Sequence, residues 1–176
     1  MVKTAIFIDG ANNHAACRVL GFSVGFDRLL HFFNKDKSLL RAFYYTAILP
    51  VPDGHDKLRP LTDWLEYNGF SVVTKLAKTF EGVDGRTKTK GNMDIEMAID
   101  AMQMAEHVDK IILFTGDGDF AYLIKALQRK GVHVTVVSTL CESINSPPMI
   151  ADELRRAADV FVDLQHIKVY IEKGRE

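Results

Sequence analysis

The sequence predicts an α/β fold, a three-layer α/β/α sandwich around a mainly parallel central sheet. Two observations support this prediction. The short apolar runs Ala5–Ile8 (AIFI) and Ile111–Phe114 (IILF) do not alternate with polar residues, which indicates strands buried on both faces. Such runs also alternate along the chain with segments of helical periodicity, the order found in successive β–α–β units.

Composition indicates one globular domain. The chain has 176 residues, so we expect a single domain over residues 1–176. Hydrophobic residues make up 47% and charged residues 26%, which excludes a largely disordered chain. The net charge is only −1. Any binding of nucleic acid must therefore depend on a local basic patch.

Several classes of protein are disfavoured. Only four apolar residues in a row precede Asp9, too few for a signal peptide. No stretch approaches the roughly 20 apolar residues of a membrane span. Cys17, Cys141 and the six His residues lack the spacing of zinc ligands. We therefore expect a cytoplasmic protein without a membrane partner or a zinc site.

In the first half of the chain, apolar and aromatic runs predict strands, and apolar residues at every third or fourth position predict helices. Pro50 and Pro52 end the second strand, and Gly69 ends the helix before the third. In order, we expect a strand at Ala5–Ile8, one or two helical turns from Asn12, a helix at Phe26–Phe33, a strand at Leu40–Leu49, a helix at Lys57–Asn68 and a strand at Phe70–Lys75.

The second half continues the alternation of helices and strands, and its clearest helix ends near His107. The helix expected at about 164–173 could lie at the periphery of the domain, and the sequence leaves this point open. In order, we expect a hairpin or loop tip at Gly82–Gly85, a helix at Asn92–His107, a strand at Ile111–Phe114, a helix at Phe120–Lys130, a strand at Val132–Val137, a short helix at Ile150–Ala158, an edge strand at Val160–Val162 and the final helix.

Carboxylates follow two of the buried strands where these strands end. Asp9 follows the first strand, and Asp117 and Asp119 lie in the TGDGD sequence after the fourth. The carboxyl ends of parallel strands share one edge of a sheet, so these side chains should converge there. Asp94 begins the helix at Asn92–His107 and should point to the same edge, although an Asp in this position also caps helices.

Several carboxylates in one place repel one another unless a cation neutralises them. Oxygen ligands suit Mg²⁺ or Mn²⁺, and these ions activate water for phosphoryl displacement. We therefore expect Asp9, Asp94, Asp117 and Asp119 to hold Mg²⁺ or Mn²⁺, directly or through water, and to be the catalytic residues. Ordinary turn or capping roles are the alternative for each of them.

Three further residues are candidates for supporting roles. Asn12 is placed to orient Asp9 or a bound water, and Thr115 to form a hydrogen bond with a ligating carboxylate. Asp100 follows Asp94 by six residues, which puts it about 120° round the helix and about 9 Å further along it. We therefore expect Asp100 to have a structural role, or to support the residues that bind the ion, rather than to bind the same ion as Asp94.

A basic segment leads directly into Asp94. Residues 75–90 carry five cationic side chains against two carboxylates, a net charge of +3. This position favours contacts with a phosphate backbone, which would make binding depend on salt. A solvated loop is the alternative. The cationic residues are Lys75, Lys78, Arg86, Lys88 and Lys90.

Four blocks of sequence, in this order, resemble the NYN domain in its bacterial LabA-like branch. They are FIDGANN at 7–13, KGNMDIEMAIDAM at 90–102, LFTGDGDFAYLIKALQRKGVHVTVVS at 113–138 and ELRRAADVFVDL at 153–164. The NYN domain belongs to the PIN-like nuclease superfamily. The resemblance spans nearly the whole chain, and it implies a PIN-like α/β/α fold and metal-dependent hydrolysis of phosphodiester bonds, most often in RNA.

The resemblance also implies roles for particular residues. Asp9, Asp94, Asp117 and Asp119 match the family's acidic positions, and Asp100 matches a further, less certain one. Asn12 matches the Asn three places after the first acid, and Thr115 the small hydroxyl residue before the G-D pair. The implied partner is RNA, in single-stranded form. A homodimer is left open, since PIN-like relatives are often dimeric.

Three functions follow as hypotheses. The first is a Mg²⁺- or Mn²⁺-dependent ribonuclease, acting as an endonuclease. The second is an RNA-binding regulatory module with weak or no catalysis, which keeps the site for binding. The third, a phosphatase of the haloacid-dehalogenase type, requires a second Asp two residues after the nucleophile. Ala11 occupies that position, which disfavours the third hypothesis.

Overall fold

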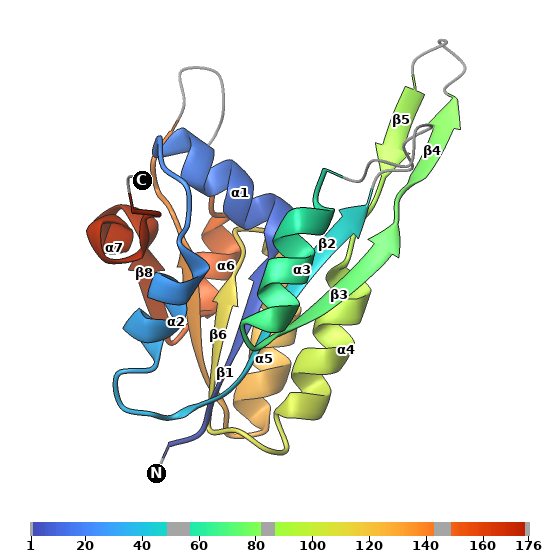
Figure 1. Cartoon of the computed structure of the whole chain (residues 1–176). Helices are drawn as coiled ribbons and strands as arrows, with labels where there is room; N and C mark the ends of the chain where they lie inside the picture. The colour runs from blue at the N-terminus through green and yellow to red at the C-terminus, as the bar shows by residue number, and fades with distance from the viewer. Residues whose placement is uncertain (1, 49–56, 82–86, 143–148, 175–176) are drawn as a thin grey trace.

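The computed structural model describes residues 2–48, 57–81, 87–142 and 149–174 (Figure 1). Six parallel strands form one sheet, and two further strands form a separate antiparallel pair. In spatial order the sheet consists of β3 (Phe70–Leu76), β2 (Leu39–Ile48), β1 (Thr4–Asp9), β6 (Lys110–Phe114), β7 (His133–Ser138) and β8 (Val160–Asp163); the pair consists of β4 (Lys78–Glu81) and β5 (Thr87–Lys90).

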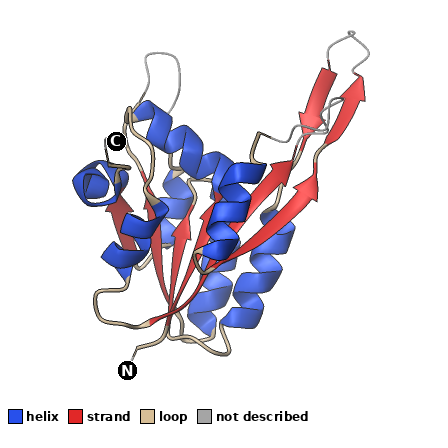
Figure 2. Cartoon of the chain, in the orientation of Figure 1, coloured by secondary structure: helices blue, strands red, loops and turns tan. Residues whose placement is uncertain are grey.

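Helices cover both faces of this sheet (Figure 2). On one face lie α4 (Asp94–Met104), α5 (Ala121–Arg129) and α6 (Asp152–Ala157). On the other lie α1 (Gly10–Val19), α2 (Phe26–Phe33), α3 (Arg59–Tyr67) and α7 (Leu164–Ile171). One turn of 3₁₀ helix, η1 (Gly118–Phe120), precedes α5. The predicted three-layer α/β/α fold with a parallel sheet is confirmed.

The central strand β1 shows why its sequence is continuously apolar. Ala5 and Phe7 enter the hydrophobic cluster under α4 and α5, whereas Ile6 and Ile8 enter the cluster under α1 and α7. All four side chains are fully buried. Since β1 pairs with β2 on one side and β6 on the other, its carboxyl end lies in the middle of the sheet edge.

The first helix starts earlier than the sequence analysis expected. It begins at Gly10, directly after β1, because the Asp9 carboxylate caps it and accepts the Asn12 N–H at 3.1 Å. Gly10 also permits a close approach to β2, because a Cβ there would lie 2.7 Å from the Tyr44 ring. The strand therefore passes into the helix without an intervening loop.

The final helix contributes to the hydrophobic core. Leu164, Ile167 and Ile171 of α7 are buried in the cluster that also contains Leu29 of α2. A hydrogen bond of 2.8 Å from the Gly25 N–H to the Ile171 carbonyl joins the two helices at their ends. These contacts pack α7 against α2 and the sheet.

The strands of the predicted hairpin are present as β4 and β5, which project beyond the carboxyl ends of β2 and β3 (Figure 1). The predicted tip at Gly82–Gly85 lies outside the described residues. The same is true of Pro50 and Pro52. Across the part of the chain that the structure describes, no helix combines the length and apolar character needed to cross a bilayer.

Candidate functional site

Three of the four predicted acids meet at the carboxyl edge of the sheet. Asp117 and Asp119 follow β6, and Asp94 is the first residue of α4. Each offers a carboxylate oxygen, and these oxygens all lie within 4.8 Å of one another. Asp94 and Asp117 are half-buried, whereas Asp119 is exposed. We call these three residues the acidic cluster.

The fourth acid, Asp9, lies beside the acidic cluster rather than in it. It lines a cavity of about 460 Å³ together with Asp94 and Asp117. One oxygen of its carboxylate accepts the Asn12 N–H, and the other accepts the Thr115 hydroxyl at 3.4 Å. Its capping role at the start of α1 fixes the carboxylate in this adjoining position.

Asn12 and Thr115 connect the two strand ends. The side-chain oxygen of Asn12 accepts the Gly116 N–H at 2.8 Å, which ties α1 to the loop after β6. The Thr115 hydroxyl donates to Asp9 and accepts the Asp117 N–H at 3.2 Å. The two side chains therefore link the ends of β1 and β6 through hydrogen bonds.

A segment that the sequence analysis missed holds the loop after β6 from the other side. The Ala151 N–H donates to the Gly116 carbonyl at 2.9 Å. A Cβ on Gly116 would overlap the Met149 carbonyl, and a Cβ on Gly118 would overlap the Glu153 carboxylate. Nothing in the local sequence around either glycine indicates this contact, because the segment lies about thirty residues further along the chain.

Burial and mutual repulsion act on the carboxylates. Burial raises the pKa of Asp9, and the charges of Asp94 and Asp117 raise it further. Burial also raises the pKa of Asp94, with added repulsion from Asp117, Asp119 and Glu96. Hydrogen bonds oppose both shifts only in part. The site is therefore one in which a cation would be favoured.

The donor set matches a hard divalent cation. The acidic cluster offers oxygen ligands alone, from side chains separated by no more than 4.8 Å. Such oxygen sets suit Mg²⁺ or Mn²⁺, whereas zinc sites are typically built with His or Cys. Asp94, Asp117 and Asp119 therefore fit the predicted ions.

Asp100 lies outside the acidic cluster, as its helical spacing indicates. Its carboxylate accepts the hydroxyl of Tyr45 at 2.8 Å. Tyr45 is almost fully buried and pairs with Asp9 in the β1–β2 register. Burial raises the pKa of Tyr45, and the bond to Asp100 raises it further. Asp100 thus anchors α4 to the strand beside the site.

The basic segment is only partly described. Lys75 and Lys78 line a cavity with Asp94 and Asp119, so they lie beside the acidic cluster. The ammonium group of Lys75 is 2.8 Å from Glu96, an ion pair that the sequence analysis did not foresee. Arg86 lies outside the described residues, and for Lys88 and Lys90 only the strand β5 is described.

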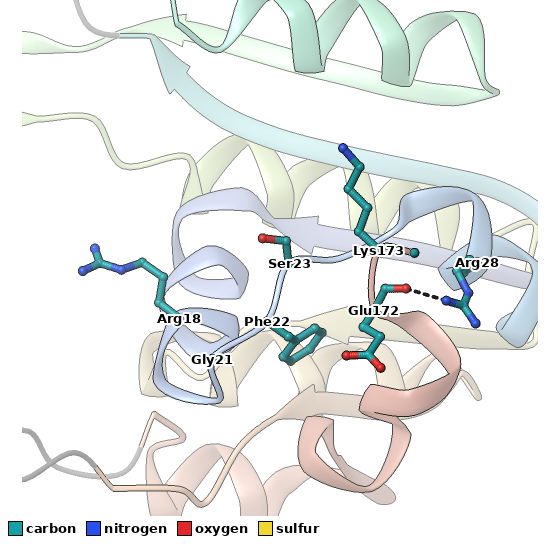
Figure 3. A pocket seen from close by; sticks show the side chains of 8 residues that line it. Arg18, Gly21, Phe22, Ser23, Arg28, Glu172 and Lys173 are labelled. Atoms are coloured by element: carbon teal, nitrogen blue, oxygen red, sulfur yellow. Dashed lines mark hydrogen bonds between the residues drawn. The ribbon is translucent and has the colours of Figure 1, made fainter. Parts of the chain in front are cut away.

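A larger cavity of about 790 Å³ lies elsewhere, between the end of α1, the start of α2 and the residues after α7. Figure 3 shows the ends of the Arg18 and Lys173 side chains lying apart rather than meeting. The Arg28 guanidinium donates to the Glu172 carbonyl at 2.8 Å. The cationic side chains that line this cavity do not converge on one point, whereas the carboxylates of the acidic cluster do.

Comparisons with known proteins agree with this arrangement. The family model of the NYN domain matches residues 3–165. The low amplitude and bright protein LabA of Synechococcus elongatus is 39% identical over 97% of this chain and 88% of its own length. A crystal structure of a protein of unknown function from Vibrio parahaemolyticus is 28% identical, with a TM-score of 0.73 and 93% of each chain covered. The chain belongs to the NYN domain family.

Proposed function

We propose that this protein is a Mg²⁺- or Mn²⁺-dependent ribonuclease that cleaves RNA internally. The observation that carries the proposal is the acidic cluster, in which three carboxylates from two elements lie within 4.8 Å at the carboxyl edge of the sheet. Membership of the NYN family supports phosphodiester hydrolysis, because this family belongs to the PIN-like nuclease superfamily.

The proposed division of labour follows the geometry. Asp94, Asp117 and Asp119 would hold the ion, and Asp9 would position a water in the cavity that it shares with Asp94 and Asp117. Asn12 would hold the Asp9 carboxylate and the loop after β6 in fixed relative positions through its two hydrogen bonds. When bound, a divalent cation supplies positive charge to the phosphate oxygens and makes water a better nucleophile.

The lysines provide the complementary charge for the RNA backbone. Lys78 is exposed and lines the cavity that contains Asp94 and Asp119. Lys75 lines the same cavity but is engaged by Glu96. Contacts between lysines and phosphates hold the RNA strand without recognising its sequence. Because these contacts are ionic, binding should weaken as the salt concentration is raised.

The decisive experiment is cleavage of a labelled single-stranded RNA in Mg²⁺, in Mn²⁺ and in excess EDTA. We expect cleavage only with the metals, and its loss in Asp117→Asn. Asn keeps a side-chain acceptor for the Asp119 N–H, which Asp117 caps at 3.0 Å, so the loop should stay folded. The matched control is Asp27→Asn, an exposed acid in the first turn of α2 on the other face.

Two outcomes would contradict the proposal. Metal-dependent cleavage by Asp117→Asn at the wild-type rate would remove the acidic cluster from the reaction. Binding of RNA without cleavage in any metal would favour the regulatory alternative. A parallel thermal melt distinguishes these cases, since Mn²⁺ should stabilise the wild type and Asp27→Asn but not Asp117→Asn.

A further inference from the structure

Large apolar side chains are exposed directly beside the acidic cluster. Ile95 of α4 has 71% of its surface exposed, and Tyr122 of α5 has 74%. Both line a groove of about 390 Å³ between the two helices, whose walls also include Met102. Single exposed apolar residues are common, but several that line one groove mark a binding surface.

The groove is continuous with the candidate site. Asp94 and Asp119 line it, and the same two residues line the cavity that contains Lys75 and Lys78. A strand with one phosphate at the acidic cluster would therefore extend over the groove on one side and over the lysines on the other. This continuity favours the proposed substrate as the occupant.

The residues of the groove suit a flat, apolar group. Ala98 and Ala126 are small and half-buried, and they leave space between the longer side chains of Ile95 and Tyr122. Nucleobases are flat, and stacking on an aromatic ring tolerates any base. A ring beside an ion that binds phosphate thus offers two contacts to one nucleotide chain.

Cationic side chains accompany the ring along α5. Lys125 and Arg129 are exposed and follow Tyr122 by three and seven residues, which places all three on one face of the helix. The Arg129 guanidinium lies over the Tyr122 ring, 5.5 Å from its centroid. These cations complement the phosphates of a strand whose bases enter the groove.

We propose that the groove between α4 and α5 binds unpaired bases next to the scissile phosphate, with Tyr122 as the stacking surface. This inference rests on the proposed function and adds to it a preference for unpaired RNA. A duplex keeps its bases stacked inside, so only an unpaired segment can place a base against Tyr122. The site would therefore prefer single-stranded RNA to the same sequence in a duplex.

Binding tests the inference separately from cleavage. We would measure fluorescence anisotropy of a short labelled oligouridylate with Ca²⁺ present, for wild type, Tyr122→Ala and Tyr122→Phe. Tyr122→Ala should bind roughly tenfold more weakly, and Tyr122→Phe should bind like the wild type, because stacking requires the ring. The matched control is Tyr67→Ala, which removes a tyrosine that is 91% exposed at the end of α3 on the opposite face.

The second arm uses the same strand annealed to its complement. The duplex should bind more weakly to the wild type, and Tyr122→Ala should not change that affinity. If neither the wild type nor any variant cleaves RNA but Tyr122→Ala still weakens binding of the single strand, the proposed function fails, and the assignment of the groove to unpaired bases stands without it.

Three results would overturn the inference. The first is equal affinity of Tyr122→Ala and Tyr67→Ala for the single strand. The second is an absence of RNA binding by the wild type. The third is an oligomer that Tyr122→Ala dissociates without changing RNA affinity, since that result would assign the groove to a second copy of the chain.

Discussion

Replacing Gly116 with Ala tests how the loop after β6 is held. The new Cβ would lie 2.7 Å from the Met149 carbonyl carbon and would overlap its oxygen. Carbon atoms in contact normally lie about 3.5–4.0 Å apart, and the overlap with the oxygen is closer still, so one of the two backbone segments must move by more than about 1 Å. Both are backbone, and neither can avoid the overlap by rotating a side chain.

The size of the effect follows from the contacts that this movement breaks. Gly116 accepts the Ala151 N–H at 2.9 Å and donates to Asn12 at 2.8 Å. Each bond contributes about 1 kcal/mol net, and overpacking a buried site costs about 1–3 kcal/mol. Gly116→Ala should therefore lower the free energy of unfolding by about 3–5 kcal/mol and displace Asp117.

Urea denaturation followed by circular dichroism measures this change. The matched control is Gly131→Ala, because Gly131 has a φ of +84° but open space around its Cβ position. Left-handed backbone alone costs an alanine about 1–2 kcal/mol. If Gly116→Ala is destabilised no more than Gly131→Ala, then the loop is not clamped as described.

Two further variants test the surroundings of the acidic cluster. Asp9→Asn retains a capping oxygen but removes the ionisable carboxyl group. Burial and the neighbouring carboxylates raise the pKa of that group, so Asp9 binds a proton more tightly in the folded wild type than in the unfolded chain. Wild-type stability in EDTA should therefore fall as pH rises through the raised pKa, and Asp9→Asn should be the more stable at neutral pH by thermal melt; equal melting profiles would contradict the shift. Tyr45→Phe removes the bond to Asp100 and should cost about 1–2 kcal/mol in urea denaturation. Its Mn²⁺ affinity should be unchanged, and a large loss would instead connect Asp100 to the metal.

The sequence predicts the fold because local patterns coincide with burial. The unbroken apolar character of β1 and β6 follows from packing on both faces, so it is visible without coordinates. The place where each strand ends is equally visible, since Asp9 ends the first apolar run and Thr115 ends the second, two residues before Asp117. Parallel pairing of the two strands then brings the acids to one edge.

Side-chain direction and distant contacts are not visible in the same way. Asp9 caps α1 and lies beside the acidic cluster. In the sequence alone, an Asp at the end of a strand is equally compatible with a turn residue, a helix cap and a metal ligand. The pairing of Lys75 with Glu96 joins β3 to α4 across 21 positions, so the count of charges could not show it. The contact of Gly116 with Met149 has the same origin in tertiary packing.

The last helix adds buried residues beyond the segment that the family model matches. The residues matched by the family model stop at 165, just after α7 begins. Ile167 and Ile171 lie beyond that boundary and are nevertheless buried against the sheet. The Lys173 N–H then donates to the Ser23 carbonyl at 2.7 Å, which fastens the chain after α7 to the connection between α1 and α2. A fragment cut at the family boundary would expose an apolar face of its own core.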